Sequence, residues 1–318
     1  MELLSLKNVE FGYKNNKIIN NLNLSVSKGE FVTLLGSSGC GKTTTLKLIS
    51  GFLNPEKGLI LLNGKLLNGI LPNKRKIGMV FQDYALFPHM TVQQNMLYGL
   101  KLKDSGIKNK DEKKQKVFET AEALGLQNLL DRFPSELSGG QQQRVALGRS
   151  LVLNPEIFLM DEPLSSLDTN LRLRVREELK ELQKKLGITT VYVTHDQEEA
   201  LYLSDRIAVM NEGKIVQCDT PEKIYFVPET KFVAEFTGMA NYLELEGTEY
   251  MVRPEWFSVS EKGDIEGKVS DSQFLGEKIR YRVDVKGRSI TVDAGCNDVR
   301  LEKGDLIQLK IQRKVPIH

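Results

Sequence analysis

The sequence predicts an α/β domain at residues 1–236, followed by a small all-β barrel at residues 237–318. In the first part, short apolar runs of strand length alternate with segments of helical periodicity, which is typical of a sheet covered by helices. After Gly238 the pattern changes to short alternating strands separated by glycine turns, which is typical of a small barrel. A chain of 318 residues has room for two such domains.

Composition narrows the class of protein. Lys and Arg number 44 and Asp and Glu 42, so the net charge of +2 predicts no general attraction to nucleic acid or to acidic membranes. The three cysteines are far apart and fit neither a disulfide framework nor a metal site, which favours a reducing, intracellular location. No apolar run approaches the roughly 18 residues of a membrane helix, and the start of the chain lacks the features of a secretory signal. A role at a membrane would therefore depend on another chain.

The chain opens with predicted strands at residues 3–11, 18–19 and 22–26, and a turn at residues 12–17 separates the first two. Tyr13 lies in this turn. Its ring could stack on a nucleotide base, or it could be a partly exposed turn residue, and position alone favours the second interpretation.

A glycine-rich loop follows the predicted strand at residues 30–35 and opens a helix that ends near Gly51. It matches the pattern G-x-x-x-x-G-K-[ST] at every fixed position, in the strand–loop–helix context that makes the pattern specific. The loop consists of Gly36, Ser37, Ser38, Gly39, Cys40, Gly41, Lys42, Thr43 and Thr44. Its glycines allow phosphates to approach, and its N–H groups face an anion. Lys42 reaches the β- and γ-phosphates, and the Thr43 hydroxyl is placed to ligate Mg²⁺.

Polar side chains stand at the ends of three further apolar strands: Gln82, the pair Asp161–Glu162, and His195. Strand ends of one sheet converge, so these residues are expected to lie together. Asp161 is expected to hold Mg²⁺, and Glu162, pointing the other way by strand alternation, to orient or deprotonate a water. Gln82 could reach Mg²⁺ or the attacking water, or be an exposed strand-end residue. A lone histidine is usually structural, but the position of His195 favours a function.

The pattern is helical from about residue 84 to residue 154. A second glycine-containing loop, Leu137 to Gln141, opens a helix there and is a second candidate anion site. A later helix carries an apolar stripe from Val175 to Leu186, and Gly187 is expected to end it.

Over about residues 1–235 the chain resembles the ATP-binding subunit of an ABC transporter. The resemblance rests on segments that occur in that family's order: the glycine loop, Gln82, Leu137-Ser138-Gly139-Gly140-Gln141, Asp161-Glu162, Ser166-Leu167-Asp168 and His195. The Leu-Ser-Gly-Gly-Gln signature is specific to that family. The resemblance implies a P-loop NTPase ABC cassette, with a RecA-like α/β core, an antiparallel β subdomain and a helical subdomain at about residues 84–154, followed by an OB-like barrel.

The resemblance also implies a role for each candidate residue. Tyr13 would stack on adenine, which reverses the preference from position alone. Six further positions would act on the ATP bound to the same chain. Lys42 and Thr43 would contact the phosphates and Mg²⁺, and Asp161 would be a Mg²⁺ ligand. Glu162 would be the catalytic base and His195 the switch histidine, while Gln82 would sense the γ-phosphate and contact the membrane subunit.

A second subunit would complete the site. Ser138, Gly139, Gly140 and Gln141 would reach the ATP bound on another copy, and Asp168 would line the seam between the two. The resemblance implies a head-to-tail dimer, and a homodimer is expected because nothing implies a separate signature-bearing chain.

The tail narrows the resemblance to importers with a C-terminal TOBE or OB-like domain, through Phe232–Gly238 and Val252–Glu255. Such importers take up polyamines, ferric iron, phosphonates, sulfate or sugars, and Phe81–Val92 is most similar to the ferric iron and polyamine branches. The implied partners are integral membrane permease subunits and, indirectly, a solute-binding protein. The implied location is the cytoplasmic face of the cell membrane, as a peripheral subunit.

Three alternatives stay open at this point. A soluble ABC ATPase acting on nucleic acid or ribosomes would carry either a long coiled-coil insertion or two cassettes, and this sequence has neither. A nucleotide kinase would not explain the Leu-Ser-Gly-Gly-Gln segment. The barrel could bind nucleic acid, but its aromatic residues are few and its charge is mixed. No nucleic acid partner is therefore expected.

Overall fold

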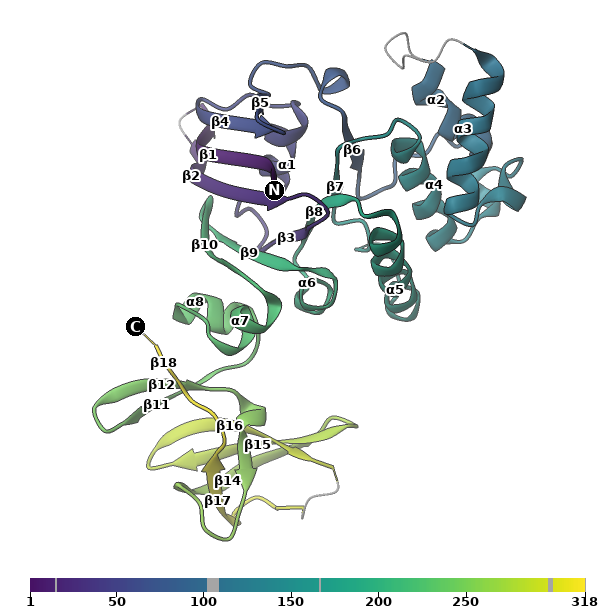
Figure 1. Cartoon of the computed structure of the whole chain (residues 1–318). Coiled ribbons are helices and arrows are strands. Elements are labelled where there is room, and N and C mark those ends of the chain that lie inside the picture. Colours follow the sequence, from purple (N-terminus) through teal and green to yellow (C-terminus); the bar gives the residue numbers. More distant parts are fainter. Residues whose placement is uncertain (15, 102–108, 166, 297–299, 318) are drawn as a thin grey trace. The chain divides into compact units, whose positions relative to one another are not determined.

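The computed structural model describes residues 1–14, 16–101, 109–165, 167–296 and 300–317 (Figure 1). The chain divides into two compact units, Met1–Pro221 and Glu222–His318. Two short helices, α7 (Pro221–Phe226) and α8 (Lys231–Phe236), lie around and after this division. The sequence places them in the first domain, and that boundary at residue 236 stays a prediction.

The first unit is built around a six-stranded sheet of order β10-β9-β3-β8-β7-β6. The five strands from β9 to β6 are parallel, and β10 pairs antiparallel with β9. The strands are β3 (Phe31–Gly36), β6 (Ile77–Val80), β7 (Ile157–Asp161), β8 (Thr189–Thr194), β9 (Arg206–Asn211) and β10 (Lys214–Asp219). Every residue of β3 and β8 is buried, as a strand covered on both faces requires. The carboxyl ends of β3, β7 and β8 therefore meet at one edge.

A second sheet, antiparallel and of order β2-β1-β4-β5, belongs to the same unit. Its strands are β1 (Glu2–Tyr13), β2 (Asn16–Ser27), β4 (Lys57–Leu62) and β5 (Lys65–Leu66). The predicted turn at residues 12–17 is too long, because Tyr13 still pairs with Asn16. Asn63 and Gly64 form the turn between β4 and β5, and both have positive φ, as a two-residue hairpin of this type needs.

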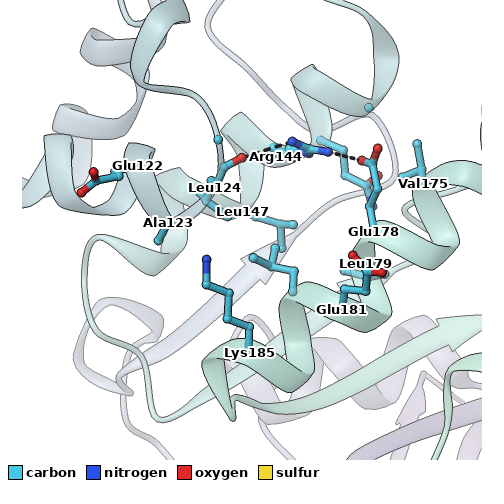
Figure 2. Close-up of a pocket in the computed structure, with 14 residues that line it drawn as sticks. Glu122, Ala123, Leu124, Arg144, Leu147, Val175, Glu178, Leu179, Glu181 and Lys185 are labelled. Atoms are coloured by element: carbon cyan, nitrogen blue, oxygen red, sulfur yellow. Dashed lines mark hydrogen bonds and ion pairs between the residues drawn. The ribbon is translucent and has the colours of Figure 1, made fainter.

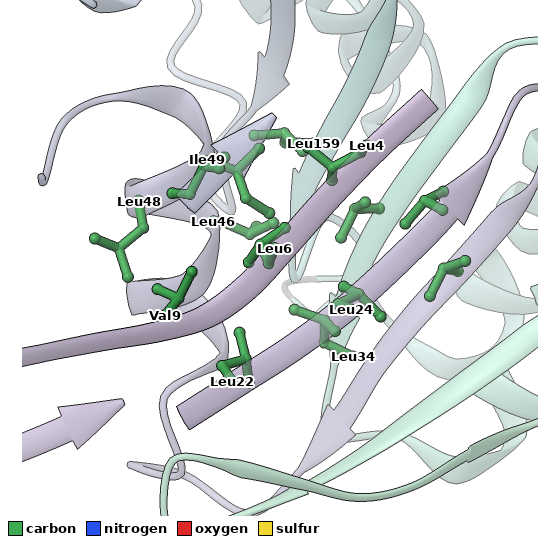
Figure 3. Close-up of a cluster of buried hydrophobic side chains, with 14 of the residues drawn as sticks. Leu4, Leu6, Val9, Leu22, Leu24, Leu34, Leu46, Leu48, Ile49 and Leu159 are labelled. Carbon is green, nitrogen blue, oxygen red and sulfur yellow. The ribbon is translucent and has the colours of Figure 1, made fainter. Parts of the chain in front are cut away.

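The main core lies between these two sheets and encloses α1 (Lys42–Ser50). Figure 3 shows Leu46, Leu48 and Ile49 of α1 among side chains of β1, such as Leu6, and of the central sheet, such as Leu34. All three helix residues are fully buried. A helix enclosed in this way holds the loop at its N-terminus in a fixed place.

The helical part of this unit has its own core. Its helices are α2 (Val92–Lys101), α3 (Lys110–Ala123) and α4 (Gly139–Leu151), with single turns η3 (Gln127–Leu129) and η4 (Pro134–Glu136). The predicted helical region is present, but its first helix begins at Val92, since Tyr84 and Ala85 have positive φ.

The remaining helical elements of the unit are η1 (Pro72–Lys74), α5 (Thr169–Leu186) and α6 (Gln197–Leu203). Gly187 ends α5 in the left-handed conformation, as predicted. None of the helices among the described residues of the chain is long and apolar enough to cross a membrane.

The second unit contains two antiparallel sheets, β11-β12-β18 and β13-β17-β14-β15-β16. The strands are β11 (Asn241–Leu245), β12 (Thr248–Val252), β13 (Phe257–Val259), β14 (Ile265–Phe274), β15 (Lys278–Val285), β16 (Arg288–Gly295), β17 (Leu306–Ile311) and β18 (Val315–Pro316), with one turn η5 (Pro254–Trp256). Three segments with the alternating pattern expected of strands, residues 280–285, 289–292 and 306–311, lie within β15, β16 and β17. The long strand β14 was not predicted, because its outer half, Ser270–Phe274, is mostly polar and exposed.

Candidate functional site

The glycine loop joins β3 to α1 and leaves its backbone open. A Cβ at Gly36 would lie 2.6 Å from both the Cys40 Sγ and the Met210 carbonyl oxygen, so this position requires glycine. Gly41 caps α1 with a φ of 106°, and no side chain bonds to the helix N-terminus. Ser37, Ser38 and Gly39 are exposed. Among the described residues no capping side chain satisfies the first N–H groups of α1, and a helix start of this kind can bind an anion.

Lys42 is buried, with 5% of its surface exposed, although it carries a charge. Its Nζ donates hydrogen bonds to the carbonyl oxygens of Gly36 (2.7 Å) and Ser37 (2.9 Å). The ammonium group is therefore held within the loop itself, beside the open N–H groups.

Thr43 and Asp161, the two predicted Mg²⁺ ligands, are brought together from α1 and the end of β7. The Thr43 Oγ1 donates a hydrogen bond of 2.9 Å to the Asp161 Oδ1. Burial raises the pKa of Asp161, and the neighbouring charge of Glu162 adds to this, while the Thr43 hydroxyl and two lysines oppose it. Hydroxyl and carboxylate oxygens are the ligand type that Mg²⁺ prefers, so the pair fits this ion.

Glu162 lies just beyond the end of β7 and adopts a positive φ of 46°. Its N–H donates to the Val193 carbonyl, and its Oε2 lies 3.0 Å from the Nδ1 of His195. The expectation that strand alternation sets the direction of the Glu162 side chain was wrong. Its left-handed backbone conformation sets that direction, since the residue lies beyond the strand. Such a conformation costs on the order of 1–3 kcal/mol and is found preferentially at functional sites.

Gln82 and Tyr13 lie at the margins of this cluster. Gln82 follows β6 by two residues, and its Nε2 donates to the Ser165 Oγ, which in turn donates to the Glu162 carbonyl. The structure thus ties Gln82 to the loop after Glu162 and not to Asp161. The Tyr13 ring is half exposed and lies in a T-shaped contact with the Phe11 ring, with a centroid distance of 5.0 Å.

The signature segment begins α4 with a complete capping box. The Ser138 Oγ accepts from the Gln141 N–H, and the Gln141 Oε1 accepts from the Ser138 N–H at 2.9 Å. Gly139 and Gly140 allow α4 to lie close to the next segment, since a Cβ on them would meet Leu167 at 2.9 Å and Val175 at 3.0 Å.

Asp168 lies in the segment against which the signature packs. It caps α5 by accepting from the Leu171 N–H, a role that the sequence analysis did not foresee. The neighbouring Ser166 lies outside the described residues. The structure brings Asp161, Glu162, His195 and the glycine loop together, and it does not bring the signature into that cluster.

A cleft of about 300 Å³ separates α4 from α5, and Figure 2 shows its lining. Arg144 of α4 spans its rim, bonding the Leu124 carbonyl on one side and Glu178 of α5 on the other. Gly140 is the only predicted site residue among those that line the cleft. This cleft is therefore distinct from the cluster formed by the glycine loop, Asp161, Glu162 and His195.

Sequence reasoning missed the buried carboxylate of Glu199, in the first turn of α6. It accepts hydrogen bonds from the Tyr192 hydroxyl and from the Thr194 hydroxyl, directly before His195. A glutamate four residues after a strand-end histidine was visible in the sequence, but nothing there showed that its side chain turns back toward the strand.

Two family models match the chain: ABC transporter over residues 19–165 and TOBE domain over residues 250–315. The chain is 50% identical over 244 residues to the spermidine/putrescine import ATP-binding protein PotA of Borreliella afzelii, covering 76% of this chain and 70% of that protein. It is 43% identical over 341 residues to the Fe(3+) ions import ATP-binding protein FbpC of Fusobacterium nucleatum, covering 98% and 91%.

Solved structures with the same fold include cbiO1 of Clostridium perfringens, part of the ABC transporter complex cbiONQ. It has a TM-score of 0.64 and 30% identity, covering 70% of this chain and 90% of that one. A dimeric post-hydrolysis state of the ATP-binding cassette MJ0796 with ADP and Pi has a TM-score of 0.59 and 33% identity, covering 69% and 99%. Neither the family models nor these relatives favour an ATPase that acts on nucleic acid.

Proposed function

The chain belongs to the family of ABC transporter ATP-binding subunits, and we propose that the glycine loop, Asp161, Glu162 and His195 form one half of its ATP site. It is the ATP-hydrolysing subunit of an importer, and it works with membrane permease subunits. The observation that carries the proposed site is the pair of bonds at one sheet edge, Thr43 to Asp161 and Glu162 to His195.

Each residue has a chemical task in this half-site. Lys42 and the open N–H groups of the loop bind the phosphates, because a fixed ammonium and a helix N-terminus both favour negative charge. The Glu162 Oε2 accepts a proton from the attacking water, and His195 orients this carboxylate through its Nδ1. The half-exposed ring of Tyr13 is assigned to stacking on adenine.

Thr43 and Asp161 would hold Mg²⁺, which supplies neutralisation of the charge on the phosphates. Among the residues that the structure describes, no three His, Cys, Asp or Glu side chains gather as a ready metal site. The remaining ligands are therefore expected to be phosphate oxygens and water, as is usual for this ion. Gln82 as a further ligand requires that its amide leave Ser165.

A second copy of the chain supplies the other half of the site. Ser138, Gly139, Gly140 and Gln141 lie outside the cluster around Asp161, so we assign them to the ATP of the partner copy, with Asp168 at the seam. The dimeric state of the cassette MJ0796 with ADP and Pi supports this arrangement.

The first candidate for the transported solute is a polyamine, since the chain is 50% identical in sequence to a spermidine/putrescine import protein over 244 residues. Ferric iron is the second candidate, because the Fe(3+) import relative matches along nearly the whole chain. In both cases the chain would lie on the cytoplasmic face of the membrane, bound to permease subunits and served indirectly by a solute-binding protein.

The test is ATPase activity of the chain reconstituted with its permease subunits and solute-binding protein in liposomes. We expect Mg²⁺-dependent hydrolysis that rises when spermidine or putrescine is added, and no such rise with ferric iron. A rise with ferric iron alone would replace the first cargo with the second. Failure of the Glu162→Gln variant to abolish the hydrolysis would overturn the proposed site.

A further inference from the structure

We propose that Glu199 is a positioning residue for His195, acting through the hydroxyl of Thr194. This inference rests on the proposed function, in which His195 orients the catalytic carboxylate of Glu162. Glu199 itself touches neither ATP nor the reacting water in this scheme.

Glu199 is 3% exposed and lies in the first turn of α6, with its side chain turned back toward the end of β8. Its Oε2 accepts a hydrogen bond of 2.7 Å from the Tyr192 hydroxyl and one of 2.9 Å from the Thr194 hydroxyl. Tyr192 and Thr194 are two residues apart on one strand, so their side chains leave the same face and reach the same oxygen. Burial raises the pKa of Glu199, and these two donors oppose that effect.

The Thr194 hydroxyl takes part in two hydrogen bonds. It donates to Glu199, and it accepts a hydrogen bond of 2.9 Å from the N–H of Asp196. Asp196 in turn accepts a bond of 3.0 Å from the N–H of Glu199 through its own carboxylate. A closed ring of hydrogen bonds therefore ties both chain neighbours of His195 to Glu199.

Within the described residues, no comparable set of hydrogen bonds holds the His195 side chain itself. Its side chain is 57% exposed, and the contact described for it is the one to Glu162. The position of the imidazole therefore depends on the backbone from Thr194 to Asp196. The closed set of hydrogen bonds among Thr194, Asp196 and Glu199 fixes that backbone. The N–H of Glu162 also bonds to Val193 of the same strand, so the base and the histidine share one support.

A matched pair of variants separates this role from ordinary stabilisation. Thr194→Val and Tyr192→Phe each remove one buried hydroxyl that donates to the same Glu199 oxygen, and each keeps the side chain's shape. Only Thr194→Val also releases the N–H of Asp196. We expect Thr194→Val to lower kcat for ATP hydrolysis by about tenfold to a hundredfold with KM for ATP nearly unchanged, because a displacement of about 1 Å near reacting groups can cost about that much. We expect kcat of Tyr192→Phe to stay within about twofold of the parent.

Both variants should lower Tm, and Thr194→Val should lower it more, since Tyr192→Phe loses one buried hydrogen bond and Thr194→Val loses two. Thr194→Ser keeps the hydroxyl and is expected to restore kcat, which also covers the case in which Thr194→Val folds poorly. Equal losses of kcat in Thr194→Val and Tyr192→Phe, or a parent-like kcat in Thr194→Val, would overturn the proposal. Glu162→Gln is measured beside them: activity in that variant counts against the proposed base, whereas the contrast between Thr194 and Tyr192 decides whether the Thr194 hydroxyl, through which Glu199 is proposed to act, positions His195.

Discussion

The N-termini of α1 and α4 both lie at glycine-containing segments, and they differ in what satisfies their backbone N–H groups. At α1 the cap is Gly41, and no side chain bonds to the helix start. At α4 the cap is Ser138, which exchanges two hydrogen bonds with Gln141. The first terminus is open for a ligand, whereas the second is already satisfied by its own side chains.

This difference implies that the two helix termini contribute to nucleotide binding in different ways. The α1 terminus, with the buried Lys42 beside it, is built to bind phosphate without help from another chain. The α4 terminus is stable by itself, so Ser138 and Gln141 must exchange internal bonds for contacts to ATP when a second copy docks. The α1 terminus should therefore govern ATP binding by the single chain, whereas the α4 terminus should affect the ATPase only once a second copy docks.

The largest expected effect is that of Glu162→Gln. Loss of the proton acceptor should lower turnover by about 10²–10³-fold while ATP binding persists, since the loop, Lys42 and Thr43 are unchanged. Both halves should then stay engaged, so size-exclusion chromatography with light scattering in ATP should detect a stable dimer. Glu244→Gln is the matched control, because Glu244 is an exposed glutamate of the second unit that pairs with the exposed Arg288 at 3.5 Å. Its turnover should equal that of the parent.

A smaller effect is expected for Lys42→Ala, a loss of ATP affinity, which tests directly whether the α1 terminus governs binding by the single chain. A hydrogen-bonded charge contributes about 1.5–3 kcal/mol, so the dissociation constant for ATP should rise by about tenfold to a hundredfold. Ser138→Ala should leave the affinity of the single chain within about twofold of the parent. Titration with a fluorescent ATP analogue in dilute protein measures both. Equal weakening in the two variants would mean that the signature contacts the ATP of its own chain.

A third prediction concerns the stability of α4. Ser138→Ala removes a helix cap worth about 1 kcal/mol and should lower Tm by about 2–4 °C. Asn109→Ala is the matched control, since Asn109 caps α3 in the same helical part by accepting from the Asp111 N–H. Both variants should lose Tm to a similar degree, but only Ser138→Ala should lose turnover, by about tenfold. A similar loss of turnover in Asn109→Ala would assign the effect to stability alone.

The same contrast separates what could and could not be predicted from the sequence. The loop between β3 and α1 was predictable because each fixed residue type has one physical task there. The capping box of α4 was also within reach, since Ser138 and Gln141 have the Ser-x-x-Gln spacing of that motif. The helix stripe on α5 and its end at Gly187 followed from periodicity and the special conformation of glycine.

Features set by distant backbone atoms were not predictable. The positive φ of Glu162 depends on the partner of its N–H in β8, and residue type does not reveal it. Arg75 is 2% exposed and donates to the carbonyls of Leu48 and Ile49 at the end of α1. In the second unit, Arg253 is fully buried and bonds the carbonyls of Ala234 and Met239. A charged residue whose partners are main-chain oxygens of other segments leaves no pattern in the sequence.

The smallest expected effect is a change in stability at the α1 half, measured with Asp161→Asn free of nucleotide and metal. Burial raises the pKa of Asp161 above its usual 3.8. Between the usual and the raised pKa, the folded chain binds more protons than the unfolded chain, so the free energy of unfolding falls as pH rises through that interval. This deficit persists at neutral pH, and the asparagine variant does not carry it.

Asp161→Asn should therefore lose turnover yet gain Tm at neutral pH, by a few degrees at most, since about 1 kcal/mol moves Tm by about 2–4 °C in a protein of this size. The gain should shrink in mild acid, where Asp161 of the parent takes up its proton. Ser138→Ala should instead lower Tm, because the serine side chain stabilises the start of α4 as its cap. A lower Tm for Asp161→Asn at neutral pH would mean that the bond from Thr43 outweighs the cost of burying the carboxylate. In that case the α1 half, like the α4 half, would be stabilised by its own side chains before ATP arrives.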